Sequence, residues 1–296
     1  MTRYLWQCAL LLLLGTQANA QETFVFPNFN RNAALANPAM QSMDSSTSFT
    51  AAGRKQWTGI NDAPSTFSFS GSTFINDPGM SIGVVAEHKS VAVNKYTSLG
   101  LMLSKTVKLS KTEYLSLGFY GGADNFSANY TGLGGGDPAL AQKQQINQWR
   151  GIVGAGLVLH GERFYFGASM PRIPLKDYKD VPVESNGYLS AGVLLPINEQ
   201  LSVAPALIWN VLNKSRALDA GATLFIQETL GVGATYRSTG EMNASLQYSF
   251  QKTLQVGYGY IFSVGNSQNI SRFSGGSHEV FINYRINNIA LPFKWW

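Results

Sequence analysis

The chain has 296 residues and a formal net charge of +5. Only 13% of its residues are charged, which is about half the share in an ordinary globular domain. Aromatic residues make up 12% and there are 30 glycines, while the mean hydropathy is close to zero. The weak, scattered positive charge argues against a nucleic-acid partner, and the polar average argues against a bundle of membrane helices. Few charges with many Tyr, Phe and Gly residues are typical of a transmembrane β-barrel, in which apolar and polar residues alternate.

Residues 1–20 are expected to form a secretory signal peptide. Arg3 supplies the short basic start, Ala9 to Leu14 form the apolar centre, and small residues precede a cleavage site near Ala20-Gln21. The alternative is a short amphipathic anchor, because the apolar stretch is shorter than the roughly 20 residues that span a bilayer. Cleavage would remove Cys8, so the mature chain would hold no cysteine for disulfides, zinc–thiolate sites or thiol catalysis.

Residues 45–296 carry a recurrent two-residue period. From Tyr114 to Gly121, for example, Leu115, Leu117 and Phe119 fall on one face and small or polar residues on the other. The same alternation in residues 65–70 places Phe67 and Phe69 toward lipid and Thr66, Ser68 and Ser70 inward. Between turn signals we predict about fourteen strands, most of them long enough to cross an outer membrane when tilted: 45–54, 65–75, 79–89, 95–107, 112–125, 150–161, 162–170, 185–196, 200–208, 217–226, 228–237, 240–250, 253–264 and 276–286.

These strands predict an all-β fold, a transmembrane antiparallel β-barrel of about 14 strands (±2). Closure follows because backbone groups that face hydrocarbon must be paired within the protein, so a spanning sheet cannot keep an edge. The alternative, a soluble β-sandwich or β-propeller, fits poorly with outward Phe and Tyr and so few Lys and Glu. Connections alternate between tight turns (76–78, 110–111, 198–199, 238–240) and longer loops (126–149, 171–184, 209–216, 264–275), which places the tight turns in the periplasm and the loops outside.

Two segments flank the predicted barrel. Residues 21–44, rich in Asn and Ala, are expected either in the lumen or at the periplasmic rim. Residues 287–296, which end in two tryptophans, either extend the last strand or form an interfacial aromatic tail. Asp137 and Pro138 also predict a short helix that reaches Trp149, since Asp favours a helix N-cap and Pro the first turn.

The residues offer no catalytic set, so we expect no enzyme activity, no cofactor and no metal site. His88, His160 and His278 share no metal-binding spacing, and His278 and Glu279, as neighbours in a strand, point to opposite faces. Glycine clusters lack the spacing of a phosphate loop, and no serine lies in a G-x-S-x-G motif. A barrel hydrolase therefore stands only as a third hypothesis.

Four short elements follow one another along the chain: Asn37-Pro38-Ala39, then Arg54-Lys55-Gln56-Trp57-Thr58-Gly59 with Ala63-Pro64 behind it, then Gly257-Tyr258-Gly259-Tyr260 and Gly276-Ser277-His278-Glu279. Their order and spacing closely resemble the PorP/SprF family of Bacteroidetes outer-membrane proteins, over about residues 22–286. The resemblance is specific because the NPA, RxQW-G and GSHE elements occur together.

The resemblance implies a non-catalytic component of type IX protein secretion, linked in some members with gliding motility. It implies an outer-membrane location and three kinds of partner: outer-membrane lipids, periplasmic ring and trunk components of the secretion system, and a secreted surface adhesin that the protein helps to export or attach. Interaction candidates are Asn37, Pro38, Ala39, Arg54, Gln56, Trp57, Gly59, Pro64, Gly276, Ser277, His278 and Glu279.

The alternative reading of these residues is structural. Trp57 would be a girdle residue at the membrane interface, and Arg54 would face lipid phosphates or lumen carboxylates. At the level of the whole protein, the second hypothesis is an outer-membrane channel for small polar solutes, whose lumen would be lined by Ser, Thr, Gly, Tyr and Gln.

Overall fold

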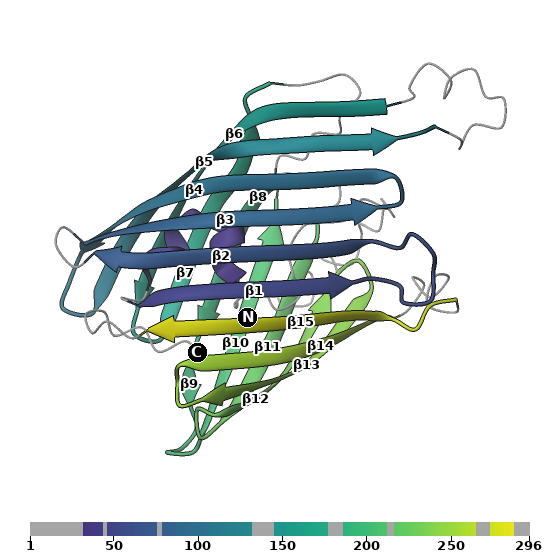
Figure 1. Ribbon diagram of the computed structural model, residues 1–296. Helices are drawn as coiled ribbons and strands as arrows, with labels where there is room; N and C mark the ends of the chain where they lie inside the picture. The colour runs from purple at the N-terminus through teal and green to yellow at the C-terminus, as the bar shows by residue number, and fades with distance from the viewer. Residues whose placement is uncertain are drawn as a thin grey trace, which may run out of the picture.

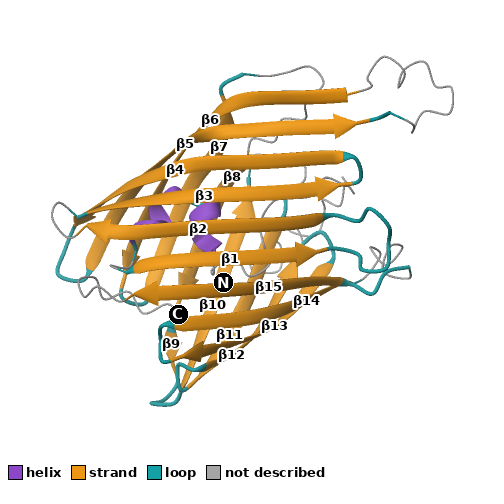
Figure 2. Cartoon of the chain, viewed as in Figure 1, coloured by secondary structure: helices purple, strands orange, loops and turns teal. Residues whose placement is uncertain are grey.

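The computed structural model describes residues 32–43, 46–75, 79–131, 145–176, 186–211, 216–264 and 273–286. These residues form a closed antiparallel β-barrel around a short helical segment from the N-terminal region (Figure 1, Figure 2). The signal peptide expected at 1–20, with its cleavage site, and the tail 287–296 lie outside the described residues.

The barrel wall consists of fourteen strands built from fifteen segments of the described chain. β8 and β9 are separated by Leu194 and both pair with β10, so they count as one interrupted strand. The predicted fold class is therefore confirmed. The segments are β1 (Thr47–Lys55), β2 (Ser65–Ile75), β3 (Met80–Val91), β4 (Asn94–Lys108), β5 (Glu113–Asn129), β6 (Gln145–Gly161), β7 (Phe164–Pro174), β8 (Asn186–Val193), β9 (Leu195–Pro196), β10 (Leu201–Asn210), β11 (Leu218–Ile226), β12 (Leu230–Arg237), β13 (Glu241–Phe250), β14 (Leu254–Ser263) and β15 (Ser277–Ile286).

Each strand pairs with its neighbours in sequence, and the first strand pairs with the last. β1 and β15 run antiparallel from Thr47 opposite Ile286 to Lys55 opposite His278, which closes the wall. The closed ring leaves the sheet no free edge, as a wall in hydrocarbon requires.

The alternation of residue types decides which side of the wall meets lipid. In β2, Ser68 and Ser70 are buried while Phe67 is 53% exposed, and in β5, Leu117 and Phe119 are exposed between buried neighbours. The predicted outward and inward faces of these strands are thus confirmed. Large apolar side chains cover the outside, and small or polar side chains cover much of the lumen.

The two ends of the barrel differ in their connections. One end, the short-turn end, holds turns of two to four residues at 76–79, 109–112, 162–163, 197–200, 227–229 and 251–253. The other, the long-loop end, holds the longer connections 56–64, 130–144, 175–185, 211–217 and 264–276, together with two short ones, 92–93 and 238–240. Short turns face the periplasm in barrels of this class, so the long-loop end is extracellular.

Two local predictions are wrong. The turn 238–240 lies at the long-loop end, not with the other predicted tight turns, because β12 and β13 form a plain hairpin there. The helix expected to reach Trp149 is also wrong where it can be checked, because β6 begins at Gln145 and Trp149 pairs with Asn125. Residues 132–144 lie outside the described chain.

The N-terminal segment 32–43 lies within the lumen. It contains a single helical turn, α2 (Ala33–Ala36), followed by a 3-10 helix, η2 (Pro38–Ser42). Both are drawn in purple inside the ring of strands (Figure 2). Residues 21–31 and 44–45 are outside the described chain.

Candidate functional site

Two sequence elements 220 positions apart meet where the barrel closes. In the β1–β15 ladder, Arg54 lies opposite Glu279 and Lys55 lies opposite His278. β1 ends and β15 begins at the long-loop end, so the junction lies at the extracellular rim. We call residues 54–59 and 275–279 together the seam.

The pairing of β1 with β15 continues into the two loops of the seam. The Thr58 amide donates to the Gly276 carbonyl at 2.8 Å, and the Gly275 amide donates to the Thr58 carbonyl at 2.7 Å. The Trp57 amide donates to Ser277 Oγ at 3.2 Å. Main-chain hydrogen bonds therefore fasten the two loops to each other, and the side chains are left to determine what the rim presents.

Unusual backbone angles explain two glycines of the seam. Gly276 has φ +80° and Gly59 has φ +93°, a region that residues with a Cβ adopt at a cost. A Cβ on Gly276 would also lie 2.7 Å from the Tyr260 ring. Trp57 takes φ +44°, which is uncommon for a bulky residue.

The other end of the same loop is fastened by Gln56 and Pro64. The Gln56 amide donates to the Pro64 carbonyl at 2.9 Å, and both side chains are buried. The backbone of residues 56–64 is therefore tied at its base by the β1–β2 hairpin and at Thr58 by the seam.

Alternate seam residues face opposite sides of the wall. Arg54 and Glu279 are buried on the lumen side, with exposures of 6% and 1%, and Arg54 Nε and Nη2 have no hydrogen-bond partner within the described chain. Lys55 and His278 lie on the outer side, where His278 Nδ1 is 2.6 Å from the Tyr258 hydroxyl and Lys55 Nζ donates to the Ala63 carbonyl at 2.9 Å. The seam thus has a charged lumen face and an outer face with aromatic neighbours, as at a membrane interface.

The Asn37-Pro38-Ala39 element lies far from the seam, in the lumen beside β6 and β7. Asn37 Nδ2 donates to the Leu157 carbonyl at 3.0 Å, and Asn37 Oδ1 accepts from the Ala39 amide at 3.0 Å. The first bond attaches the segment to the wall and the second caps η2, with Pro38 at its first position. One side chain therefore serves both the helix and its attachment.

Four lumen-facing glycines on four strands make room for this segment. A Cβ on Gly118 would overlap the backbone of Pro38 and Ala39, coming within 2.6 Å of Ala39 Cα. A Cβ on Gly156 would lie 2.9 Å from Asn37 Cγ, while Gly167 faces Asn37 Nδ2 and Gly83 faces the Gln41 amide. We call these four glycines the berth. Sequence reasoning missed the berth, although its glycines fall in phase with the lumen face of their strands.

Further contacts hold the segment along its length. Ser169 Oγ donates to the Ala36 carbonyl at 2.6 Å. Asn32 donates to Ser68 Oγ and accepts from Ser70 Oγ, each at 3.0 Å. Leu35 packs on apolar lumen side chains, including the seam-side pair Ala52 and Phe281. Thr106, near the end of β4, donates to the Ser42 carbonyl at 3.4 Å. The segment therefore reaches from the middle of the lumen toward the short-turn end.

Paired charges in the lumen were also missed by sequence reasoning, because their members come from different strands. Arg172 donates to Glu87 at 2.8 Å. Arg237 donates two hydrogen bonds to Asp219, at 2.7 and 2.9 Å, and a third to Glu241 at 3.2 Å. Such bidentate geometry fixes the arginine side chain, so the pairs set the shape of the lumen as well as its charge.

One pair resembles part of a catalytic site. Ser116 Oγ lies 3.1 Å from His160 Nε2, which is within reach for a nucleophile and its base. Both side chains are fully buried in the wall, with exposures of 0% and 1%. A substrate could not reach Ser116 in this arrangement, so the pair is best understood as a satisfied buried hydrogen bond.

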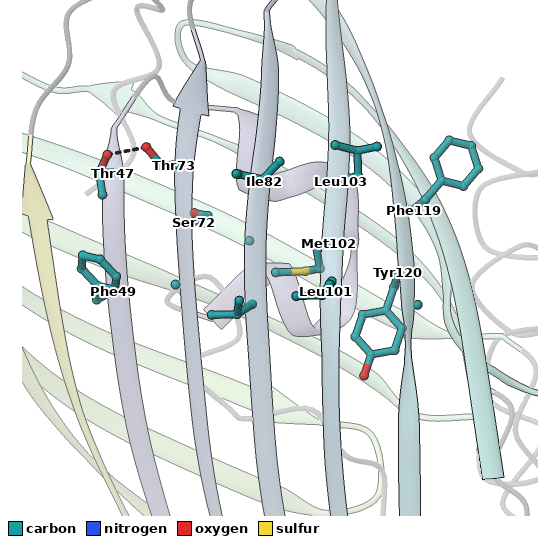
Figure 3. A pocket seen from close by; sticks show the side chains of 14 residues that line it. Thr47, Phe49, Ser72, Thr73, Ile82, Leu101, Met102, Leu103, Phe119 and Tyr120 are labelled. Carbon is teal, nitrogen blue, oxygen red and sulfur yellow. Dashed lines mark hydrogen bonds between the residues drawn. The ribbon is translucent and has the colours of Figure 1, made fainter.

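A shallow depression of about 710 Å³ lies over β1–β5 (Figure 3). Its exposed side chains, among them Phe49, Leu101 and Phe119, belong to the outer face of the wall. Gly71 and Gly121 leave its floor without side chains, and the Thr47 and Thr73 hydroxyls at one edge bond each other at 2.7 Å. It is therefore an apolar feature of the lipid-facing surface.

Within the described ranges, no group of three or more His, Cys, Asp or Glu side chains is placed to hold a metal ion. None of the helices in the same ranges is long and apolar enough to cross a membrane.

The closed fourteen-strand wall, its apolar outer face and its contrasting ends define an outer-membrane β-barrel protein. The chain matches the family model for the type IX secretion system membrane protein PorP/SprF over residues 18–284. It therefore belongs to the PorP/SprF family, and the resemblance inferred from the motifs is confirmed. The comparison with curated protein sequences found no match.

Solved structures share the fold at low sequence identity. The Pseudomonas putida toluene transporter TodX is 12% identical with a TM-score of 0.52, covering 87% of this chain and 94% of its own. A Pseudomonas aeruginosa FadL homologue is 13% identical with a TM-score of 0.52, and the match covers 86% of this chain and 94% of the homologue. At this identity the likeness establishes the barrel fold alone.

Proposed function

We propose that this protein is a non-catalytic component of type IX secretion that helps a partner adhesin reach, or remain attached to, the cell surface. The observation that carries the proposal is the seam, where two of the family-like elements form one hydrogen-bonded structure at the extracellular rim. Loops held by a rigid scaffold are where binding residues usually lie. The seam is therefore the surface we assign to the adhesin.

The short-turn end of the barrel, opposite the seam, suits a different partner. Its short turns carry exposed charges, such as the Lys252–Glu228 pair at 2.5 Å. Periplasmic ring and trunk components of the secretion system would meet the barrel at this end. A role in gliding motility would follow wherever the attached adhesin moves along the surface.

An open channel for small polar solutes is less well supported, because residues 32–43 occupy part of the lumen. The absence of enzyme activity is likewise a proposal, supported by the burial of the Ser116–His160 pair.

The proposal is tested by deleting the gene and comparing the surface proteome with that of cells complemented by the wild-type chain. We expect a loss of one or a few large surface proteins, restored by complementation. An unchanged surface proteome in the deletion strain would reject the secretion role.

A further inference from the structure

A barrel of fourteen strands is too wide to be filled by its own wall. Eight strands enclose an interior that inward side chains can just fill, while sixteen to eighteen leave an aqueous channel. Inward residues here are often small, as at Gly118, Gly156, Ser68 and Ser70. Space in the lumen is therefore taken up by something other than wall side chains, and in the described chain that is residues 32–43.

The berth shows that this position is built into the wall. At Gly118 and Gly156 a single added methyl group would collide with Ala39 or Asn37, and the clash at Gly118 is with backbone, which cannot rotate away. Asn37 enters between β6 and β7 and bonds a wall carbonyl. The wall is thus shaped to receive this segment in one position.

The attachment is also reversible by its nature. α2 and η2 add no strand to the ladder, since every wall strand pairs with two other strands and the ring closes through β1 and β15. The segment is held by a small number of neutral hydrogen bonds, from Asn32, Asn37 and Ser169 among others, and by apolar contacts of residues such as Ala39 and Met43. Each of these hydrogen bonds contributes modestly. Because no strand pairing of the wall involves the segment, its withdrawal would leave the ladder of the wall intact.

We propose that the barrel is a latent pore for hydrated ions and small polar solutes, closed by residues 32–43 and opened when that segment leaves the berth. The proposal goes beyond the role in adhesin display and does not depend on it. Within the lumen several charges lie in pairs of opposite sign, as in Arg172–Glu87 and Arg237–Asp219. The open pore would therefore discriminate little between small cations and anions.

The test is the conductance of the full chain, purified from outer membranes, in planar bilayers. Asn37→Ala removes the wall bond and the cap of η2, and Gly118→Ala fills the berth. Asn37→Ala should raise the time-averaged conductance about tenfold over the wild type, the factor expected for losing one or two hydrogen bonds. Gly118→Ala should also raise the conductance, because its methyl group collides with the backbone of the segment. Gly121→Ala is the matched control, because Gly121 lies on the same strand with nothing within 4 Å of its Cβ position.

A reversible lock completes the test. Ala36→Cys with Ser169→Cys in the Asn37→Ala background places cysteines at two neighbouring positions, since Ser169 Oγ donates to the Ala36 carbonyl. The one native cysteine, Cys8, lies in the expected signal peptide. Oxidation should return the conductance to the wild-type level, and reductant should release it.

Three outcomes would overturn the proposal. In the first, the wild-type chain conducts as well as Asn37→Ala. In the second, the Asn37→Ala barrel is folded, as its heat-modifiable migration shows, but does not conduct. The third is an oxidised lock that leaves the conductance high. If Gly118→Ala fails to assemble, Asn37→Ala and the lock still decide. If the variants do not conduct but the adhesin is displayed normally, only the latent-pore proposal is rejected. If conductance is gated as expected but gene deletion leaves the surface proteome unchanged, only the secretion role is rejected.

Discussion

The seam and the N-terminal segment fasten distant parts of the chain by opposite means. At the seam, loops are joined by main-chain hydrogen bonds between Thr58 and residues 275–276 and by a bond from the Trp57 amide to Ser277 Oγ, and the other side chains project to either face. In the lumen, the wall has glycine at the four berth positions, and the missing side chains let a folded segment approach the wall backbone. The first arrangement presents side chains at the rim, whereas the second conceals a segment. This contrast assigns the partner surface to the seam and closure of the lumen to residues 32–43.

Gly118→Leu should break the lumen arrangement and leave the seam unchanged. A leucine there must displace the Pro38–Ala39 backbone, at a cost of about 3 kcal/mol, the upper part of the range for overpacking. Limited proteolysis with mass spectrometry should then detect cleavage within residues 32–43. Gly121→Leu is the control, and equal protection of the segment in both variants would show that the berth does not hold it.

Leu35→Ala sharpens the comparison, because Leu35 packs on lumen residues and on the seam-side pair Ala52 and Phe281. We expect a loss of about 2 kcal/mol in the free energy of unfolding in detergent, the lower part of the range for such truncations. Amide exchange at Thr58 should stay slow if the two regions are independent. Faster exchange there would show that the segment supports the seam.

Gly276→Ala should break the seam and leave the segment in place. The positive φ and the Tyr260 ring together should cost about 1–2 kcal/mol and open the loop pairing. Hydrogen exchange at the Thr58 amide should accelerate, while residues 32–43 remain resistant to protease. Gly275→Ala is the matched control, since its nearest neighbours lie at 3.5 Å or beyond and its φ is not positive. Similar exchange in both variants would contradict this account of Gly276.

Ser277→Ala should have the smallest effect. It removes one hydrogen bond, from the Trp57 amide, and should cost about 1 kcal/mol. Exchange at Trp57 should rise several-fold, with Thr58 little changed because its bonds are to main-chain atoms. If Thr58 exchange rises as much as that of Trp57, the seam opens as one unit.

The barrel itself could be predicted because its strongest signal is local. Strand 65–75 was placed with the bounds that the structure shows, since Phe and Ser alternate there without interruption. The predicted start of β6, at residue 150, lies five residues after the observed start at Gln145. The reason is that polar residues on its outer side, at Gln145 and Asn147, interrupt the alternation that marks the lipid-facing part of the strand.

The candidate site was predictable in its parts and not in its assembly. Both seam elements were identified, and closure of the predicted ring already implies that the first and last strands pair. The register of that pairing, which sets Arg54 opposite Glu279, is visible only in the structure. The role of Asn37-Pro38-Ala39 depends on glycines at 118, 156 and 167, whose purpose is visible only when the approaching backbone is in place. Pairs such as Glu87–Arg172 are separated by several strands and leave no local pattern.

The most direct test of the central claim is the abundance of surface proteins in cells that carry Gly276→Ala, measured against cells that carry Gly275→Ala. If the seam is the surface that serves the adhesin, Gly276→Ala should lower the same surface proteins that gene deletion removes, with a normal amount of barrel in the outer membrane. Equal surface proteomes in the two strains, with amide exchange confirming that the seam is open in Gly276→Ala, would contradict the claim.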